Sequence, residues 1–371
     1  MRMGNVMNTN GLGWRRIVTV ALGSLATLVV IAVAGEIGIR WLDPQEHLPP
    51  DLFVTDAALG YRVAPNYRGE YVTRTFSVPL ITNSLGLRDR EYGPRSEGGL
   101  RVYMIGDSFV FGNRVPVEQT VTKVLERTLR ERLAPRPVEV VNGGMPGYST
   151  IQELKFFEQT VDQVQPDLVV LGMCVGNDIW DNLLYSTRNT EDGGGGAWRA
   201  GGGGWRARLT LLLKRSDLYL LIRRTFNQTF RGEEVEDTHA DRPASSVDPA
   251  LRLTLEAVRG MANITRRRGV GFAVFLITVP KRVIPTATQQ DLNARFTTFA
   301  QREGIEVLDL NPFFTMHSNE DLYYTVHWTP RGHEIVAQAV ADLLTQRGWL
   351  NAPAMASRDG RRNGGPAVAG P

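Results

Sequence analysis

The chain has 371 residues, of which 42% are apolar and 22% are charged, and its net charge is +3 at pH 7. These values are typical of a globular protein with one large domain and appendages, or with two small domains. No dense basic run with interleaved aromatic residues appears, which argues against a nucleic-acid partner. The only cysteine, Cys174, excludes an intramolecular disulfide, and no cysteine and histidine cluster has zinc spacing. The sequence therefore suggests neither a metal site nor any other cofactor.

An uncharged apolar segment covers residues 17–35, and three arginines lie in residues 1–16 before it. At about 1.5 Å per residue, a helix of this length is close to the hydrocarbon thickness of a bilayer. The arginines predict that residues 1–16 stay cytoplasmic and that the rest is exported, as in a single-pass anchor in a bacterial inner membrane. The alternative is a signal peptide, because Ala32-Val33-Ala34 is typical of a cleavage site. Cleavage would leave a secreted or periplasmic protein.

Residues 36–100 carry short apolar stretches between turn signals, and we interpret them as a lead-in segment with a few short strands. From residue 101 to residue 350 the pattern alternates between strands and helices. Such alternation predicts a mostly parallel sheet covered by helices on both faces. Five short runs rich in β-branched residues are the expected strands: 102–105, 138–141, 168–171, 272–279 and 305–310.

Two helix starts are marked by their capping residues. Thr150-Ile151-Gln152-Glu153 has the pattern of a capping box, in which the first and last side chains bond each other's backbone. Thr329-Pro330 predicts the start of the last helix, because proline is favoured at the first helical position, and Gly348 predicts its end.

An insertion interrupts the alternation at residues 188–247. Two glycine runs in it hold no core and predict a flexible segment, and residues 209–230 that follow have an amphipathic helical pattern. This helix is expected to form a lid, to lie on a membrane surface or to pack against the domain, and packing is the simplest of the three. The glycine-, proline- and arginine-rich residues 351–371 predict a disordered tail.

The polar segments that follow the expected strands are the candidate site. Gly106-Asp107-Ser108 ends the first strand, so Ser108 is expected at the rim of the sheet, where a substrate reaches it. His327 precedes the last helix and can return to the same rim as a base for Ser108. If the two side chains meet, the chain is an acyl-handling serine enzyme.

Two further segments provide candidate oxyanion donors. Gly147 lies between the second strand and a helix start, where a free backbone N–H is a natural donor to a developing negative charge. Asn177 follows the third strand, and its side-chain amide can donate to the same oxyanion.

The ordered motifs GDSFVFG, NGGMPGYST, VGND and HWTPRGH resemble those of the SGNH (GDSL-type) hydrolases, over residues 101 to 348. Upstream, LGYRVAPNYRG and ITNSLGLRD resemble the membrane-anchored bacterial branch of that family. The resemblance implies a flavodoxin-like three-layer α/β/α sandwich with a parallel sheet of about five strands. It also implies that Ser108 is the nucleophile and His327 the base. The oxyanion donors would be the N–H groups of Ser108 and Gly147 and the side chain of Asn177.

One position departs from the family pattern. Members usually carry an aspartate three residues before the base histidine, and this chain has Tyr324 there. Asp321 lies six residues before His327, and its carboxylate can orient the imidazole if the loop folds back. Otherwise the enzyme works as a serine–histidine dyad. His333 is the competing base, and we interpret it as a packing residue.

These observations predict an extracytoplasmic serine esterase that removes O-acyl groups, acetyl above all, from a cell-envelope glycan. An apolar acyl pocket built from Phe109, Phe111 and Trp328 would instead indicate a lipid ester. Two rival hypotheses stay open. One is an acyltransferase that modifies a surface polysaccharide on the same fold, and the other is a non-catalytic binding or assembly protein, to which the missing aspartate gives weight.

Overall fold

The computed structural model describes residues 10–43, 48–72, 77–175, 178–191, 213, 216–231, 247–280, 286–324 and 326–351. The chain divides into two compact units. The smaller unit comprises residues 1–50, 72–76 and 204–235, and the larger unit comprises the remainder.

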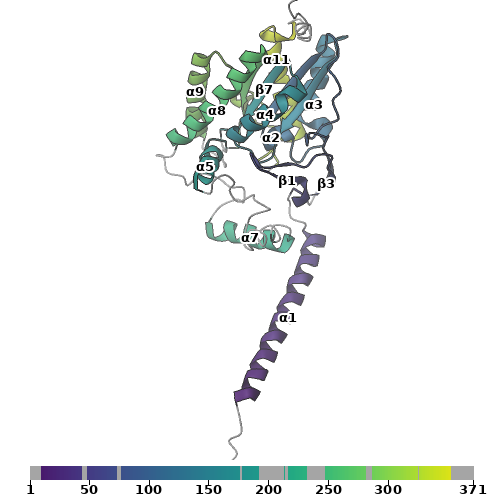
Figure 1. The fold of residues 1–371 in the computed structure, drawn as a ribbon, viewed down its shortest axis with the longest axis vertical. Coiled ribbons are helices and arrows are strands. Elements are labelled where there is room, and N and C mark those ends of the chain that lie inside the picture. The colour runs from purple at the N-terminus through teal and green to yellow at the C-terminus, as the bar shows by residue number, and fades with distance from the viewer. Residues whose placement is uncertain are drawn as a thin grey trace, which may run out of the picture. The chain divides into compact units, whose positions relative to one another are not determined.

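The larger unit is built around one parallel sheet (Figure 1). Its five strands run in the order β6-β5-β7-β8-β9, so that β5 and β7 lie at the centre. The strands are β5 (Leu100–Gly106), β6 (Val138–Gly144), β7 (Leu168–Met173), β8 (Gly271–Leu276) and β9 (Glu306–Asp309). These are the five expected strands. Each residue of β5 and β7 is buried, as expected where helices cover both faces of a parallel sheet.

Helices cover the two faces of this sheet. One face packs on α3 (Val121–Leu133), α10 (Asn311–Met316) and α11 (Pro330–Gln346), and the other on α4 (Thr150–Val164), α5 (Asp178–Glu191), α8 (Val247–Arg268) and α9 (Thr286–Glu303). The alternation of side chains along β5 fits this arrangement. Val102 and Met104 join the core cluster with α3 and α11, whereas the Tyr103 hydroxyl bonds Thr160 of α4 at 2.8 Å. The predicted three-layer sandwich is therefore confirmed.

The segment before the sheet forms small strands. The short helix η1 (Pro50–Leu52) leads into two two-stranded sheets, β1-β2 and β3-β4. Their strands are β1 (Phe53–Asp56), β2 (Gly60–Val63), β3 (Arg68–Val72) and β4 (Ser77–Ile81). The remaining short helices are α2 (Ser108–Phe111), η2 (Val117–Gln119) and η5 (Trp349–Asn351).

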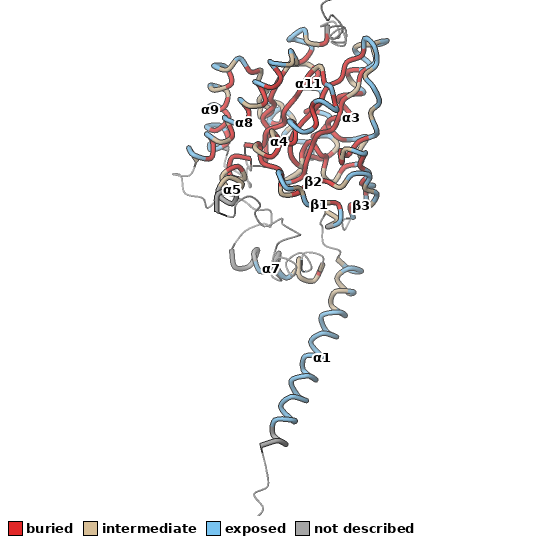
Figure 2. Tube along the Cα trace, viewed as in Figure 1, coloured by how far each residue is buried: buried red, intermediate tan, exposed pale blue. Residues whose placement is uncertain are grey.

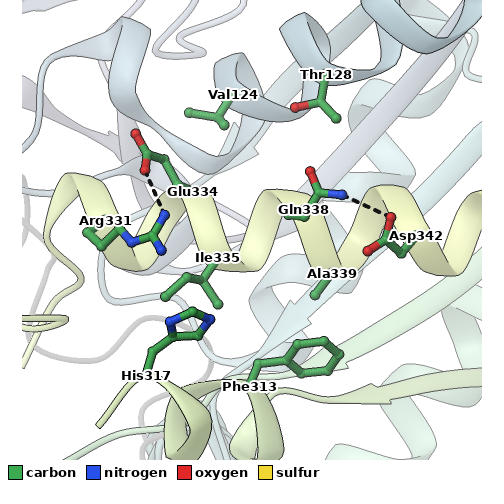
Figure 3. Close-up of a pocket in the computed structure, with 10 residues that line it drawn as sticks. All are labelled: Val124, Thr128, Phe313, His317, Arg331, Glu334, Ile335, Gln338, Ala339 and Asp342. Atoms are coloured by element: carbon green, nitrogen blue, oxygen red, sulfur yellow. Dashed lines mark hydrogen bonds and ion pairs between the residues drawn. The ribbon is translucent and has the colours of Figure 1, made fainter. Parts of the chain in front are cut away.

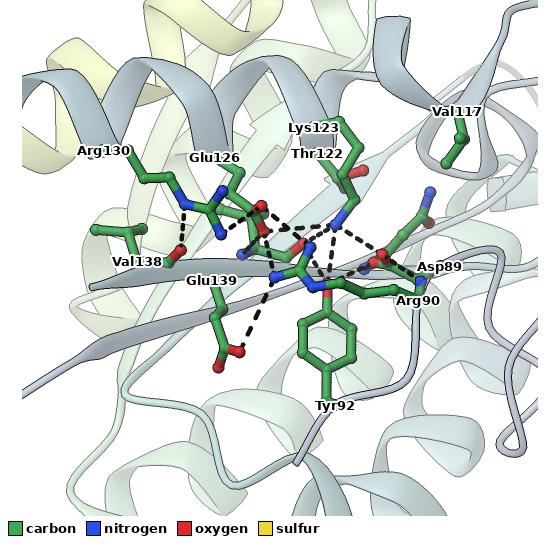
Figure 4. Close-up of polar contacts among 12 residues, drawn as sticks. Asp89, Arg90, Tyr92, Val117, Thr122, Lys123, Glu126, Arg130, Val138 and Glu139 are labelled. Carbon is green, nitrogen blue, oxygen red and sulfur yellow. Dashed lines mark hydrogen bonds and ion pairs between the residues drawn. The ribbon is translucent and has the colours of Figure 1, made fainter. Parts of the chain in front are cut away.

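A buried ionic network joins residues 89–92 to α3 and β6 (Figure 4). The Lys123 ammonium lies 2.7 Å from the Asp89 carboxylate, and both side chains are buried. Arg90 donates two hydrogen bonds of 3.1 Å to Glu126. Asp89 also accepts the backbone N–H of Asn142 at 2.9 Å. The network therefore fixes the lead-in chain to the end of β6 that carries the candidate site.

The capping box at the start of α4 lies one residue earlier than predicted. Ser149, rather than Thr150, is the N-cap, and Gln152, rather than Glu153, completes the box. The two patterns overlap in the sequence, and glutamine performs the reciprocal bond as well as glutamate does. Glu153 is thereby left buried with no capping role.

The smaller unit contains α1 (Asn10–Leu42) and α7 (Asp217–Arg231). Within α1, Trp14–Leu42 is long and apolar enough to cross a membrane, with a mean hydropathy of 2.6 and none of its residues buried (Figure 2). The helix expected at 209–230 corresponds to α7, although residues 209–212 lie outside the described part of the chain. The glycine runs of the insertion and residues 352–371 also lie outside it.

Candidate active site

Ser108 lies at the carboxyl end of β5, as the first residue of α2. The Asp107 carboxylate accepts the backbone N–H of Phe109 at 2.9 Å and so caps this short helix. The helix ends at Gly112, whose φ of 78° is left-handed. This tight strand–helix turn presents the Ser108 side chain at the rim, where it is only half-buried.

His327 reaches the same rim from the other end of the domain. Its Nε2 atom lies 2.7 Å from the Ser108 Oγ atom. The imidazole also packs against Phe109, with a ring-centroid distance of 5.1 Å. The structure therefore brings together the two residues on which the predicted chemistry depends, 219 positions apart in the chain.

The protonation of His327 suits a proton acceptor. Burial, and after it the positive charge of Arg114, lower the pKa of His327 from 6.5 to about 3. The imidazole is consequently neutral at pH 7, and its Nε2 atom is able to accept the Ser108 proton. The sequence analysis missed Arg114, because no motif links it to the histidine.

Gly147 lies in the loop between β6 and α4. The loop is joined to the nucleophile strand by a 2.8 Å hydrogen bond from Met145 N–H to the Gly106 carbonyl. Gly147 itself is exposed and has a φ of 75°, a left-handed conformation that favours glycine. The loop that carries exposed Gly147 is thus bonded to the end of the strand that precedes Ser108.

Tyr61 of β2 holds this loop in place through hydrogen bonds. Its hydroxyl donates to the Pro146 carbonyl at 2.6 Å, and the Tyr148 hydroxyl donates back to the Tyr61 carbonyl at 2.6 Å. A Cβ atom at Gly147 would lie 2.8 Å from the Tyr61 hydroxyl. Burial, followed by the charges of Asp181 and Asp107, raises the pKa of Tyr61, which keeps its hydroxyl protonated as a donor.

Tyr61 falls within LGYRVAPNYRG, a segment that the sequence analysis used only for its family resemblance. The family resemblance of this segment therefore pointed to a residue near the candidate site. Nothing in its spacing indicated that Tyr61 would bond the Pro146 carbonyl.

Arg88 is a second residue that the sequence analysis missed. Its buried guanidinium donates to the carbonyls of Phe111, Gly112 and Val115, at 3.2, 2.5 and 2.7 Å. Burial lowers the pKa of Arg88 to about 10, so that it stays charged at neutral pH. Arg88 thereby stabilises the chain at and after the end of α2.

Asn177 lies outside the described residues, and its candidate role stays a prediction. The described residues on either side of it are joined by a hydrogen bond of 2.8 Å from Cys174 N–H to the Asp178 carboxylate. Asp178 therefore bonds local backbone, and Cys174 is buried.

Three buried carboxyl groups lie behind the rim: Asp107, Glu153 and Asp178. Burial and the charge of Asp107 raise the pKa of Glu153 well above its usual range. Burial, Glu153 and Asp107 do the same for Asp178. These groups carry charges of the same sign in a region of low dielectric, so that protonation relieves their repulsion.

Asp321 is exposed, and its backbone carbonyl accepts a hydrogen bond from the Thr329 hydroxyl at 2.6 Å. His333 lies fully inside the domain, where its Nδ1 atom accepts the backbone N–H of Val121 at 3.1 Å and its ring packs edge-on against Trp328. The environment of His333 is thus that of a packing residue.

The three aromatic side chains considered for an acyl pocket are buried. Phe109, Phe111 and Trp328 are exposed by 3%, 0% and 0%. Phe109 and Trp328 lie in the main core cluster, with ring centroids 4.9 Å apart. All three are therefore occupied by core packing.

A cavity of about 400 Å³ lies elsewhere, between α3, α10 and α11 (Figure 3). Its charged lining residues have partners: Arg331 bonds Glu334 and, outside the lining, Glu320. His317 lies 2.6 Å from Glu320, and Asp342 accepts a hydrogen bond from Arg132 at 2.7 Å. Neither Ser108 nor His327 lines this cavity. Within the described part of the chain, no group of acidic, cysteine and histidine side chains is suited to hold a metal ion.

The comparisons with known proteins agree with the sequence resemblance. Residues 104–335 match the GDSL-like lipase/acylhydrolase family. No curated protein matches the chain.

Similar solved structures include a lipase/acylhydrolase from Enterococcus faecalis, with 15% identity, a TM-score of 0.41, and coverage of 67% of this chain and 96% of its own. Esterase EstA from Pseudoalteromonas sp. has 12% identity, a TM-score of 0.40, and coverage of 68% and 99%. The acetyl xylan esterase AlAXEase has 12% identity, a TM-score of 0.41, and coverage of 66% and 100%.

Proposed function

The chain belongs to the GDSL-like lipase/acylhydrolase family, and from this premise we propose that it hydrolyses an ester with Ser108 as the nucleophile and His327 as the general base. The observation that carries the proposal is the 2.7 Å distance between Ser108 Oγ and His327 Nε2. This is the separation that direct proton transfer between the two atoms requires.

The reaction follows from this geometry. Ser108 Oγ attacks the acyl carbonyl while its proton passes to His327 Nε2. The resulting oxyanion accepts hydrogen bonds from the N–H groups of Ser108 and Gly147 and from the Asn177 side chain. His327 then protonates the leaving alcohol. A water molecule, deprotonated by His327, attacks the acyl-serine and releases the carboxylic acid.

We propose that the base works in a dyad with Ser108. The proposal is supported by the position of Asp321, which is exposed and uses its backbone carbonyl to bond Thr329. Burial, and after it the positive charge of Arg114, lowers the pKa of His327 and so favours the neutral imidazole. The neutral imidazole is the form that accepts a proton.

For the substrate, we propose a short O-acyl group, acetyl above all, on a cell-envelope glycan. The aromatic residues that would line a long-chain pocket are packed in the core, which favours a small acyl group. A series of aryl esters of increasing chain length, assayed with the wild-type protein and with Ser108→Ala, tests this. We expect the acetyl ester to give the highest kcat/KM; a rise with chain length would contradict the proposal.

We further propose that α1 anchors the chain in the inner membrane and that the hydrolase unit is extracytoplasmic. The support is the length and hydropathy of Trp14–Leu42 and the arginines that precede residue 17. Retention of the full-length chain in carbonate-washed membranes, with the intact N-terminus found by mass spectrometry, is the expected result. A soluble chain beginning at Gly35 would instead identify a cleaved signal peptide.

A further inference from the structure

The start of α7 is capped by a residue of α1. The Glu36 carboxylate accepts the Ser216 hydroxyl at 2.7 Å and the backbone N–H groups of Asp217 and Leu218 at 3.1 Å each. Helices usually receive this cap from the residue just before their first turn. Ser216 does so here by accepting the backbone N–H of Tyr219 at 3.1 Å. Glu36, 180 positions earlier in the chain than Ser216, adds a second set of acceptors that joins the two helices.

The two helices also approach each other closely beside this cap. A Cβ atom at Gly35 would lie 3.2 Å from Leu218 Cδ2, a tighter contact than most side chains tolerate. The side of α7 that carries Leu218 therefore faces α1.

The same side of α7 continues as an exposed apolar stripe. Leu218, Ile222 and Phe226 are spaced four residues apart and thus share one helix face. Ile222 is 58% exposed and Phe226 is 52% exposed. Large apolar side chains that are neighbours on one face mark an interaction surface rather than scattered surface residues.

The environment of α1 indicates what covers this stripe. Most apolar side chains between Trp14 and Leu42 are exposed, Ile31 by 62% and Ile37 by 64%, which suits acyl chains as neighbours. Glu36 and Arg40, 2.6 Å apart, are the first charged residues after the apolar segment and belong at the level of the lipid headgroups. The cap at Glu36 therefore starts α7 at the membrane interface.

We propose that α7 is an interfacial membrane helix, whose Leu218–Phe226 stripe enters the lipid bilayer beside α1 and whose start is held there by Glu36. This inference rests on the proposed anchoring of α1. It gives the insertion a role: residues 217–231 make a second contact with the lipid surface, in the geometry of amphipathic helices that lie in the interface.

The test measures how close single positions lie to the acyl chains. Full-length protein in a Cys174→Ala background, which removes the only cysteine, is reconstituted in vesicles of phosphatidylcholine and phosphatidylglycerol. An environment-sensitive fluorophore is attached through Phe226→Cys on α7, Val29→Cys on α1 or Gln301→Cys on the exposed side of α9. Lipids brominated on the acyl chain quench only labels that lie in the bilayer.

We expect brominated lipid to quench the label at position 226 to an extent comparable to position 29, and to leave position 301 unaffected. Quenching at position 29 without quenching at position 226 would overturn the inference alone. Such a result would mean that the stripe packs on protein or faces water. No quenching at position 29 would instead show that the anchoring itself is wrong.

Removing the cap provides a matched comparison. Glu36→Ala in the Phe226→Cys chain is expected to reduce quenching at position 226, whereas Arg40→Ala, which removes the ion pair and keeps the cap, leaves it unchanged. Quenching at position 29 is expected to be the same in both. Equal quenching at position 226 in the Glu36→Ala and parent chains would contradict the role of the cap.

Discussion

The two sides of the candidate site are supported in different ways. Ser108 follows the central strand β5, and Gly147 follows the neighbouring edge strand β6. Met145, Tyr61 and Arg88 hold their loops through buried hydrogen bonds. The histidine side is a loop with exposed residues at Asp321 and Tyr324. It is held by the backbone bridge between Tyr323 and Trp328. Two side-chain hydroxyls add hydrogen bonds, from Thr329 to the Asp321 carbonyl and from Tyr323 to the Thr278 carbonyl.

This difference indicates which residues can be substituted with little loss of activity. On the side of Ser108, buried hydrogen bonds hold the loops that carry Ser108 and Gly147. On the histidine side, the imidazole packs against the Phe109 ring. Residues that touch the reacting atoms should therefore matter most, and Asp321 should matter little.

The largest effect is expected for His327→Ala. Without the base, the Ser108 hydroxyl is not deprotonated, and kcat should fall by roughly 10³-fold or more. Steady-state kinetics on an acetyl ester measure this, and an unchanged melting temperature shows that the variant is folded. A loss below tenfold would remove His327 from the proposed base role.

Tyr61→Phe tests the support of the nucleophile side. Loss of the bond to the Pro146 carbonyl should let the Gly147 N–H shift from the oxyanion and lower kcat by roughly tenfold, with little change in KM. Tyr67→Phe is the matched control, because the Tyr67 hydroxyl bonds the exposed Asp51 at 3.2 Å. If both variants behaved alike, the loop would not depend on Tyr61.

Asp321→Ala tests the histidine side. Because the carboxylate is exposed, the variant should keep kcat within about threefold of the wild type, unlike the loss of a true third member of a triad. A loss as large as that of His327→Ala would establish Asp321 as that member and would make the two sides alike.

Arg114→Gln gives the smallest effect at neutral pH. The Arg114 cation opposes protonation of His327, so its removal should raise the pKa of His327 and move the acid limb of kcat/KM to higher pH. Burial is the main cause of the lowered pKa and persists in the variant. The midpoint of the acid limb should therefore stay below pH 6.5. A limb that stays in place or moves to lower pH would contradict this assignment.

The sequence predicted the parts that local pattern determines. Continuous apolar runs identified all five strands, and polar segments after them indicated one edge of the sheet, where Ser108 and His327 indeed meet. The capping box was misplaced by one residue because Ser149 and Gln152 offer the same chemistry as Thr150 and Glu153.

Long-range support could not be predicted from the sequence. Tyr61 and Pro146 are 85 positions apart, and Arg88 bonds carbonyl groups that any sequence provides. Periodicity and spacing carry no information about such contacts, because they arise only when separate elements pack together.

Covalent labelling of the full-length protein with a fluorophosphonate, quantified by intact mass, tests whether Ser108 is the nucleophile. A serine activated by His327 should take up one phosphonyl group per chain, whereas Ser108→Ala should take up none and His327→Ala should react far more slowly. Absence of labelling in the wild type, or equal labelling in Ser108→Ala, would contradict the assignment of Ser108 as the nucleophile.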